Sequence, residues 1–101
     1  MTKAVVVRYR TNTEGAEENE RLIRQVFHEL SAERPEGLRY AAFRLDDGVS
    51  FLHVATLDGD DNPLTSSAAF REFQSGLKER CVDPPAPTEA TVIGSYRLLA
   101  E

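Results

Sequence analysis

Histidine is the residue type best suited to proton chemistry near neutral pH, and this chain contains two of them. His53 stands in an apolar run between Leu52 and Val54, where an imidazole could carry a proton or hold a ligand. The alternative is a histidine whose ring is satisfied by a tyrosine or a backbone group. Because no acidic residue is placed to orient the ring, the sequence leaves both interpretations open.

Tyr40 and Arg44 are predicted to lie beside His53 on one face of a β-hairpin. Tyr40 could donate a hydrogen bond to an oxygen atom of a ligand, and Arg44 could pair with an anion. Alternatively, Tyr40 packs in an interface and Arg44 bridges to Asp46 or to a partner chain. The candidate catalytic residues are therefore His53 and Tyr40, and the candidate ligand-binding residues are Arg44 and Phe51.

We expect no metal site and no cofactor. His28 and His53 are far apart in sequence and lack an accompanying pattern of acidic residues, and Cys81 is the only cysteine. The acidic loop at residues 58–62 lacks the glutamate that a calcium loop needs at its twelfth position, where Ala69 stands. The chain also has no glycine-rich phosphate-binding motif.

Length and composition narrow the class of protein. With 101 residues, the chain is expected to form one domain over residues 1–101, and 41% hydrophobic residues are typical of a soluble globule. A net charge of −5 argues against a nucleic-acid partner, because neutralising phosphates needs clustered Lys and Arg. No apolar run approaches the ~20 residues of a membrane span, and the first residues do not form a signal peptide. These features predict a cytoplasmic protein.

The elements that must position His53 follow from hydrophobic periodicity and turn residues. The predicted order is strand, helix, strand, strand, helix, strand, with strands at residues 3–10, 38–45, 49–57 and 89–99. The first helix starts at Glu17 and ends before Pro35, and Ser66 or Ser67 caps the second. Three prolines at 84, 85 and 87 are predicted to form a stiff connector, and Gly94 marks a bulge in the last strand. This order defines the α+β, ferredoxin-like βαββαβ fold: a four-stranded antiparallel sheet with two helices on one face.

The Asp47-Gly48 pair predicts a two-residue, type I′ hairpin turn, which fixes the facing pairs of the hairpin. Ala42 then faces His53, whereas an odd-length loop would place Phe43 there. One face carries Phe43, Leu52 and Val54, and we expect it to contact the helices. The other face carries the remaining alternate residues: Leu38, Tyr40, Ala42, Arg44, Val49, Phe51, His53, Ala55 and Leu57.

The face that carries His53 is also largely apolar, so it is not suited to contact with water. We therefore expect a homodimer in which two sheets pack face to face and leave a lumen where the polar groups converge. The alternative is a monomer with scattered exposed apolar residues, which are common on protein surfaces.

Four segments carry a resemblance to a known family: AVVVRYR at residues 4–10, FLHV at 51–54, FREF at 70–73 and GSYR at 94–97. Over nearly its whole length the chain resembles the dimeric α/β-barrel superfamily, and especially its antibiotic-biosynthesis-monooxygenase-like group. The resemblance implies a sheet-to-sheet dimer. It also implies three kinds of relative: cofactor-independent oxygenases of polycyclic phenols, haem-degrading enzymes, and small proteins without a known activity.

The chain departs from the haem-degrading enzymes, which the resemblance associates with a tryptophan, because it contains none. Only Tyr40, Arg44 and His53 could stand in for the residues that the phenol oxygenases use. Two hypotheses follow. In the first, the lumen binds a small aromatic or apolar ligand, and His53 with Tyr40 assists proton removal before a cofactor-independent monooxygenase reaction. In the second, the chain is a non-catalytic dimer with a binding, structural or regulatory role.

Overall fold

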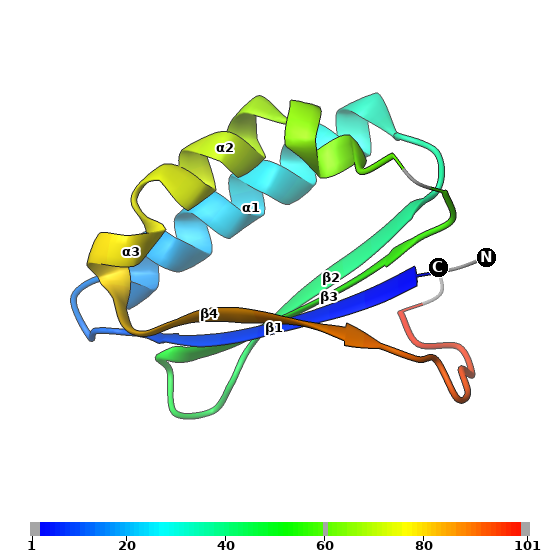
Figure 1. The fold of residues 1–101 in the computed structure, drawn as a ribbon. Helices are drawn as coiled ribbons and strands as arrows, with labels where there is room; N and C mark the ends of the chain where they lie inside the picture. The colour runs from blue at the N-terminus through cyan, green and yellow to red at the C-terminus, as the bar shows by residue number, and fades with distance from the viewer. Residues whose placement is uncertain (1–2, 60, 100–101) are drawn as a thin grey trace.

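The computed structural model describes residues 3–59 and 61–99, which form a sheet with helices packed on one face (Figure 1). The strands are β1 (Lys3–Thr11), β2 (Leu38–Arg44), β3 (Ser50–Leu57) and β4 (Cys81–Ala90). The helices are α1 (Ala16–Glu33), a 3₁₀ turn η1 (Pro63–Ser66), α2 (Ala68–Ser75) and the short α3 (Leu77–Arg80). This is the predicted βαββαβ order.

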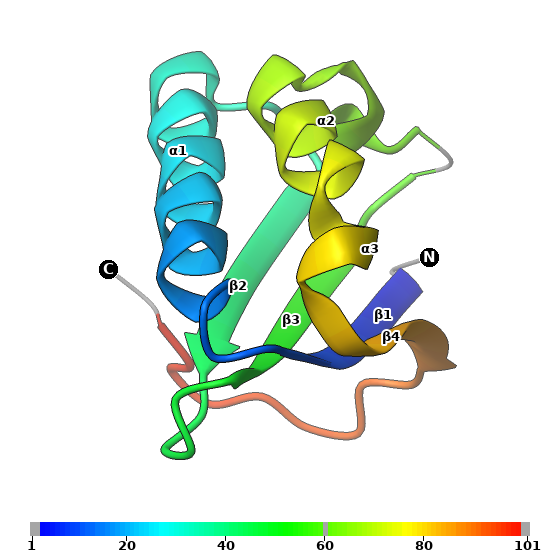
Figure 2. The same cartoon turned by 90° about the vertical axis from the view of Figure 1, so that its left-hand side faces the viewer.

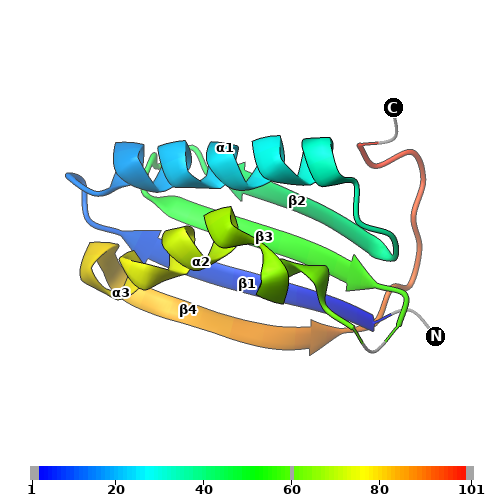
Figure 3. The same ribbon diagram turned by 90° about the horizontal axis from the view of Figure 1, so that it is seen from above.

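The sheet is antiparallel throughout, with the strand order β2-β3-β1-β4 (Figure 3). The helices form a single layer on one face of it, and Figure 2 shows α1 and α2 side by side in this layer. Leu22, Ile23 and Val26 of α1 are buried, as the helical spacing predicts. None of the helices within the described residues has the length and apolarity that crossing a membrane requires.

The β2–β3 hairpin has the predicted register, with Ala42 paired to His53 and Arg44 to Phe51. The turn type differs from the prediction. Gly48 has a φ of +79°, but Asp47 is not in the left-handed region, so the turn is not type I′. The Asp47 carboxylate instead accepts hydrogen bonds from the backbone of Val49 and Ser50 and from the Ser50 hydroxyl, and these bonds lower the pKa of Asp47.

The last strand was predicted wrongly. β4 begins directly after α3 and contains Pro84, Pro85 and Pro87, whereas residues 91–99 form no strand. β4 is an edge strand, and proline is tolerated there because one side of an edge strand needs no backbone N–H donors. The three prolines are therefore part of the sheet and not a connector.

The two faces of the sheet were assigned the wrong way round. Tyr40, Phe51 and His53 belong to or pack against the core beneath the helices. Strand alternation then places Val6, Leu52 and Val54 on the opposite face, where all three are half-buried. Both faces are apolar enough to be covered, so apolarity did not distinguish them. Aromatic and polar side chains from distant parts of the chain determine which face of the sheet packs against the helices.

Candidate functional site

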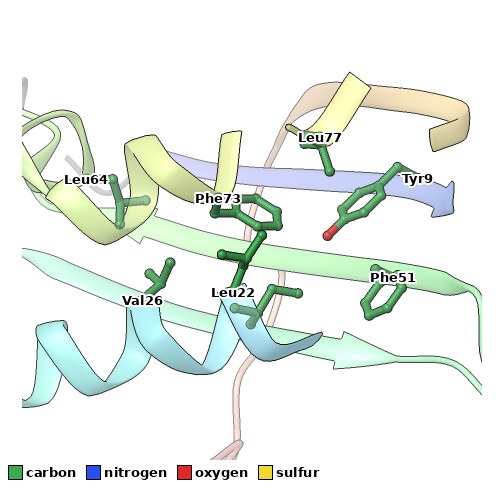
Figure 4. Packing of buried hydrophobic residues seen from close by; sticks show 8 residues of the cluster. Tyr9, Leu22, Val26, Phe51, Leu64, Phe73 and Leu77 are labelled. Atoms are coloured by element: carbon green, nitrogen blue, oxygen red, sulfur yellow. The ribbon is translucent and has the colours of Figure 1, made fainter. Parts of the chain in front are cut away.

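The site lies under the helices, in the middle of the sheet. Val7 of β1 and Ala42 of β2 pair directly with His53 of β3. Tyr9 and Tyr40 each lie two positions from these neighbours, on the same face of the sheet, and therefore flank His53. Phe73 of α2 stacks on the imidazole with ring centroids 5.6 Å apart, and Tyr9 lies 5.3 Å from it. Figure 4 shows the Tyr9 hydroxyl directed into the core, towards Phe73 and Leu22.

Both ring nitrogens of His53 have tyrosine partners. The Tyr9 hydroxyl lies 2.8 Å from Nε2, and the Tyr40 hydroxyl lies 2.5 Å from Nδ1. Nδ2 of Asn19, from α1, donates to the Tyr9 oxygen at 2.9 Å. His53 is thus satisfied by two tyrosines, which matches the structural alternative of the sequence analysis and also joins His53 to Tyr40.

Burial controls the ionisation of this group. It lowers the pKa of His53 to about 4, because the imidazolium form would lose its hydration without gaining a carboxylate. Burial also raises the pKa values of Tyr9 and Tyr40 above their ordinary range. At neutral pH the cluster is therefore an uncharged imidazole between two protonated phenols.

A cavity of about 530 Å³ opens beside this cluster, between the sheet and α2. Tyr40 and His53 both line it. Most of the other lining side chains are apolar and come from the sheet, η1, α2 and α3: Val5, Val7, Ala55, Leu57, Leu64, Phe70, Phe73, Leu77, Pro85 and Pro87. The volume and the apolar walls with few polar groups are typical of a pocket for a small organic molecule.

The polar groups of the rim come mainly from the segment that covers the sheet. Asn62, Thr65, Arg71 and Gln74 line the cavity and are exposed. Arg71 is the only charged residue among the described lining residues, and its guanidinium donates to the Thr65 carbonyl at 3.2 Å. A cation at the rim favours a ligand with a negatively charged or electron-rich oxygen.

The other two candidate residues lie outside this cavity. Arg44 forms salt bridges with Glu17 and Glu20 of α1, at 3.0 and 2.8 Å, and not with Asp46. Phe51 is only 1% exposed and stacks on Tyr9 at 5.5 Å. Arg44 thus connects α1 to the sheet and Phe51 packs in the core, and their ligand-binding role stays a prediction.

Sequence reasoning did not find Tyr9, Asn19 or Arg71. One signal was present for Asn19, since it falls on the same stripe of α1 as Leu22, Ile23 and Val26. A polar residue on a buried stripe needs a hydrogen-bond partner, and such a residue predicts a polar group on the facing sheet. The partnership of Tyr9 with His53 spans 44 positions and has no local signal.

No described group of three or more His, Cys, Asp and Glu side chains could hold a metal ion. The cavity wall also presents no acidic residue among those that the structure describes. The arrangement can therefore bind an apolar body and offer hydrogen bonds to its oxygen atoms.

Comparison with known proteins agrees with the ferredoxin-like fold of the antibiotic-biosynthesis-monooxygenase-like group. No protein-family model matches the sequence, and no curated protein matches it. Solved structures do match over nearly the whole chain, at low identity. At these identities the likeness shows a shared fold.

Three of these structures show the degree of similarity to this chain. Rv0793 of Mycobacterium tuberculosis is 17% identical, with a TM-score of 0.74, and the match covers 94% of this chain and 98% of that one. A mutant of SnoaB, a cofactor-independent oxygenase from Streptomyces nogalater, is 15% identical, with a TM-score of 0.69 and coverages of 96% and 98%. An antibiotic biosynthesis monooxygenase is 12% identical, with a TM-score of 0.69 and coverages of 93% and 100%.

Proposed function

We propose that the cavity between the sheet and α2 binds a small aromatic molecule, which the protein oxygenates without a cofactor. The observation that carries this proposal is the cavity of about 530 Å³ with apolar walls and the Tyr40–His53 pair in its lining. The shared fold with SnoaB, a cofactor-independent oxygenase, supports the choice of reaction. In this proposal the ligand binds inside the chain, under α2, in place of the lumen between two sheets that the sequence predicts.

The reaction needs an electron-rich substrate, because the substrate itself must reduce oxygen. An anthrone is a suitable probe: its CH₂ group becomes a carbonyl, one oxygen atom enters the product and the other leaves as water. The four electrons that reduce O₂ come from that carbon. The step begins when the substrate loses a proton to form an enolate. The Tyr40 hydroxyl and the charge of Arg71 would stabilise this anion.

His53 is a weak base for this step. Moving a proton from a phenol of ordinary pKa, about 10, to an imidazole with a pKa of about 4 is unfavourable by roughly 8 kcal/mol. We therefore assign His53 the role of holding Tyr40, and we expect the proton to leave to water. Substrates that ionise near neutral pH should react fastest.

Oxygen uptake with a panel of quinols and anthrones of graded acidity tests the proposal. The rate should rise with pH through the pKa of each substrate and should fall in Tyr40→Phe. A rate that rises near pH 4 and is flat above would show that His53 is the base, and absence of protein-dependent uptake across the panel would reject the oxygenase.

The lack of a strong base also favours a second function, which is ligand binding without catalysis. In that case the same molecules bind in the cavity but consume no oxygen beyond the rate in buffer. Calorimetric titration beside the oxygen measurement separates the two functions.

We also propose that the protein is a homodimer formed through the sheet face opposite the helices. Val6, Leu52 and Val54 give this face an apolar centre. A second apolar surface lies in the tail, residues 91–99, where Ile93 and Tyr96 are 99% and 81% exposed. A second copy of the chain could cover both surfaces, because each copy offers an apolar sheet face and an apolar tail.

A further inference from the structure

A continuous chain of hydrogen bonds reaches the cavity from α3. It runs through five residues from two helices and three strands: Arg80, Asn19, Tyr9, His53 and Tyr40. We propose that this chain starts at Arg80, fixes the proton of His53 on Nδ1, and makes the Tyr40 hydroxyl a hydrogen-bond donor towards the ligand. The inference rests on the proposed function, because it concerns what the ligand in that cavity must offer.

The direction of the first bond is fixed by the chemistry of arginine. Arg80 Nε lies 3.1 Å from Oδ1 of Asn19, and a guanidinium can donate hydrogen bonds but cannot accept them. The atom that faces Arg80 is therefore the amide oxygen of Asn19. Its NH₂ group must then point the other way, to the Tyr9 hydroxyl at 2.9 Å.

The second bond determines what the Tyr9 hydroxyl can do. Its oxygen accepts from Asn19, so its single hydrogen is free for His53 Nε2 at 2.8 Å. If Nε2 instead carried the proton, the Tyr9 oxygen would accept two bonds. Its own hydrogen would then have no partner among the described residues.

Burial decides between these two arrangements. One hydroxyl hydrogen lacks a partner among the described residues in either case, on Tyr9 when Nε2 carries the proton and on Tyr40 when Nδ1 carries it. Both tyrosines line the cavity, but Tyr9 is 3% exposed and Asn19 is 0% exposed, whereas Tyr40 is half-buried and more accessible to water or a ligand. An unsatisfied buried donor costs about 1–3 kcal/mol, which corresponds to a preference of roughly five-fold to more than a hundred-fold. Tyr9 therefore donates to Nε2, and the imidazole carries its proton on Nδ1.

The last bond then has only one direction. His53 Nδ1–H donates to the Tyr40 oxygen at 2.5 Å, and Tyr40 has no other hydrogen-bond partner among the described residues. Its hydroxyl hydrogen remains available at the wall of the cavity, which Tyr40 lines. The site therefore selects ligands that present an acceptor, such as a carbonyl or enolate oxygen, over ligands that present only donors.

Arg80 is held firmly enough to set this direction. Its second nitrogen, Nη2, donates to the Phe73 carbonyl at 2.9 Å, and its guanidinium lies 5.7 Å from the Phe73 ring centroid. A Cβ atom at Gly76 would come within 2.9 Å of Nη1, and one at Gly15 within 3.1 Å of the Arg80 Cβ. Glycine at both positions leaves room for the arginine against the backbone.

The position of the imidazole proton can be measured directly. Long-range ¹H–¹⁵N correlation spectra of the imidazole rings at neutral pH distinguish a protonated nitrogen from an unprotonated one. We expect His53 to show a single neutral form with the proton on Nδ1. Exposed His28 gives the second ring signal for comparison. A proton on Nε2, or an even mixture of the two forms, would overturn the inference.

Asn19→Asp should reverse the chain. A carboxylate beside Arg80 can only accept, so Tyr9 would donate to it and would accept from His53 Nε2–H. Tyr40 would then donate to Nδ1 and lose its donor function in the cavity. We expect the ring proton to move to Nε2, and binding of a quinone, which has acceptors only, to weaken by about ten-fold.

Asn12→Asp is the matched control. It makes the same chemical change close to α1, but Asn12 Oδ1 already acts as an acceptor, for the backbone N–H of Gly15. We expect the proton to stay on Nδ1 there. Retention of the Nδ1 form in Asn19→Asp would contradict the inference, and if that variant does not fold, the wild-type spectrum still decides.

This experiment separates the inference from the proposed function. The location of the proton is a property of the free protein and needs no ligand. If His53 carries the proton on Nδ1 but no aromatic compound binds, the proposed function fails and the chain stands. If quinones bind equally well to the wild-type protein and to a folded Asn19→Asp variant, Tyr40 does not select for acceptors.

Discussion

The uncharged state of His53 controls the chemistry of the cavity at the scale of single residues. An imidazole with a pKa of about 4 does not pair with an anion at neutral pH, and both of its nitrogens already have hydroxyl partners. Its effect on a ligand passes through Tyr40, which stacks on Phe27 with ring centroids 4.9 Å apart. Tyr40 is therefore held on its face by Phe27 and at its hydroxyl by His53.

Tyr40→Phe should weaken the binding of a ligand with an acceptor oxygen by about ten-fold, because it removes one hydrogen bond of about 1.4 kcal/mol and leaves the aromatic ring. Isothermal titration calorimetry with a quinone measures this change. Tyr96→Phe is the control, since Tyr96 is 81% exposed in the tail and should leave the affinity unchanged. Equal affinities in all three proteins would show that the Tyr40 hydroxyl does not bind the ligand.

The buried His53 also predicts how stability depends on pH. Its pKa is about 4 in the folded protein and about 6.5 in the unfolded chain, so the unfolded chain binds more protons between these values. Stability should therefore fall as the pH is lowered through this window, by about 2 kcal/mol between pH 7 and pH 5. Urea unfolding at both pH values measures the change.

His53→Gln provides the comparison, because glutamine keeps hydrogen-bonding groups but does not titrate. Its free energy of unfolding should depend less on pH than that of the wild-type protein, by most of those 2 kcal/mol. Parallel pH profiles in the two proteins would show that His53 is not buried in its neutral form.

At the scale of elements, the roof of the cavity depends on how α2 begins. The Ser67 hydroxyl accepts a hydrogen bond from the Phe70 backbone N–H, as the predicted cap requires, and it also donates to Glu29 of α1. Asn62 caps the preceding turn η1 with a bond from the Leu64 backbone N–H at 3.0 Å. These caps hold Phe70, Arg71 and Phe73 over the sheet.

Ser67→Ala should lower the free energy of unfolding by about 1 kcal/mol, the usual effect of losing an N-cap. Ser66→Ala is the neighbouring control. The Ser66 hydroxyl is exposed and only donates to the Pro63 carbonyl, so its loss should change stability by less than about 0.5 kcal/mol. Thermal unfolding followed by circular dichroism compares the two variants, and equal losses would show that the cap does not stabilise α2.

The predictability of these elements follows the range of the interactions that form them. The hairpin register was correct because Asp47 and Gly48 are local signals. Ser67 and Pro35 marked helix ends for the same reason. The sequence predicts β4 about eight residues too late, because proline disfavours a strand unless that strand lies at the edge of a sheet. Strand position in a sheet is a long-range property.

In the candidate site, too, the local relations could be predicted from the sequence and the long-range ones could not. His53 and Tyr40 were paired correctly by counting along the hairpin, and the structure joins them by a hydrogen bond. The choice of face depended on Tyr9, Asn19 and Phe73, which come from three other elements. Only the folded chain brings these residues together.

At the scale of the whole molecule, the sheet has two apolar faces. The helices cover one of them and leave the other open (Figure 1). All large hydrophobic side chains with high exposure in the described residues, apart from Val82, lie in the tail. Apolar surface of this kind on a folded chain marks an interaction site. In the proposed dimer, a second copy of the chain covers this apolar surface.

Val54→Lys should dissociate the dimer, because the lysine would place a charge at the centre of the open face without a partner. Sedimentation equilibrium at micromolar concentration should show a dimer for the wild-type protein and a monomer for the variant. Gln25→Lys adds the same charge on the exposed side of α1 and should remain dimeric. A wild-type protein that is monomeric under these conditions would contradict the proposal.

The most direct test of the binding site is a titration with a quinone, followed in methyl spectra of the assigned protein. Neighbouring residues of β1 report on opposite faces: Val5 and Val7 line the cavity, whereas Val6 faces the open side of the sheet. We predict saturable shifts of the Val5, Val7 and Leu64 methyl signals and little change at Val6 and Val54. Shifts confined to Val6 and Val54, or no shifts at all, would contradict a ligand site between the sheet and α2.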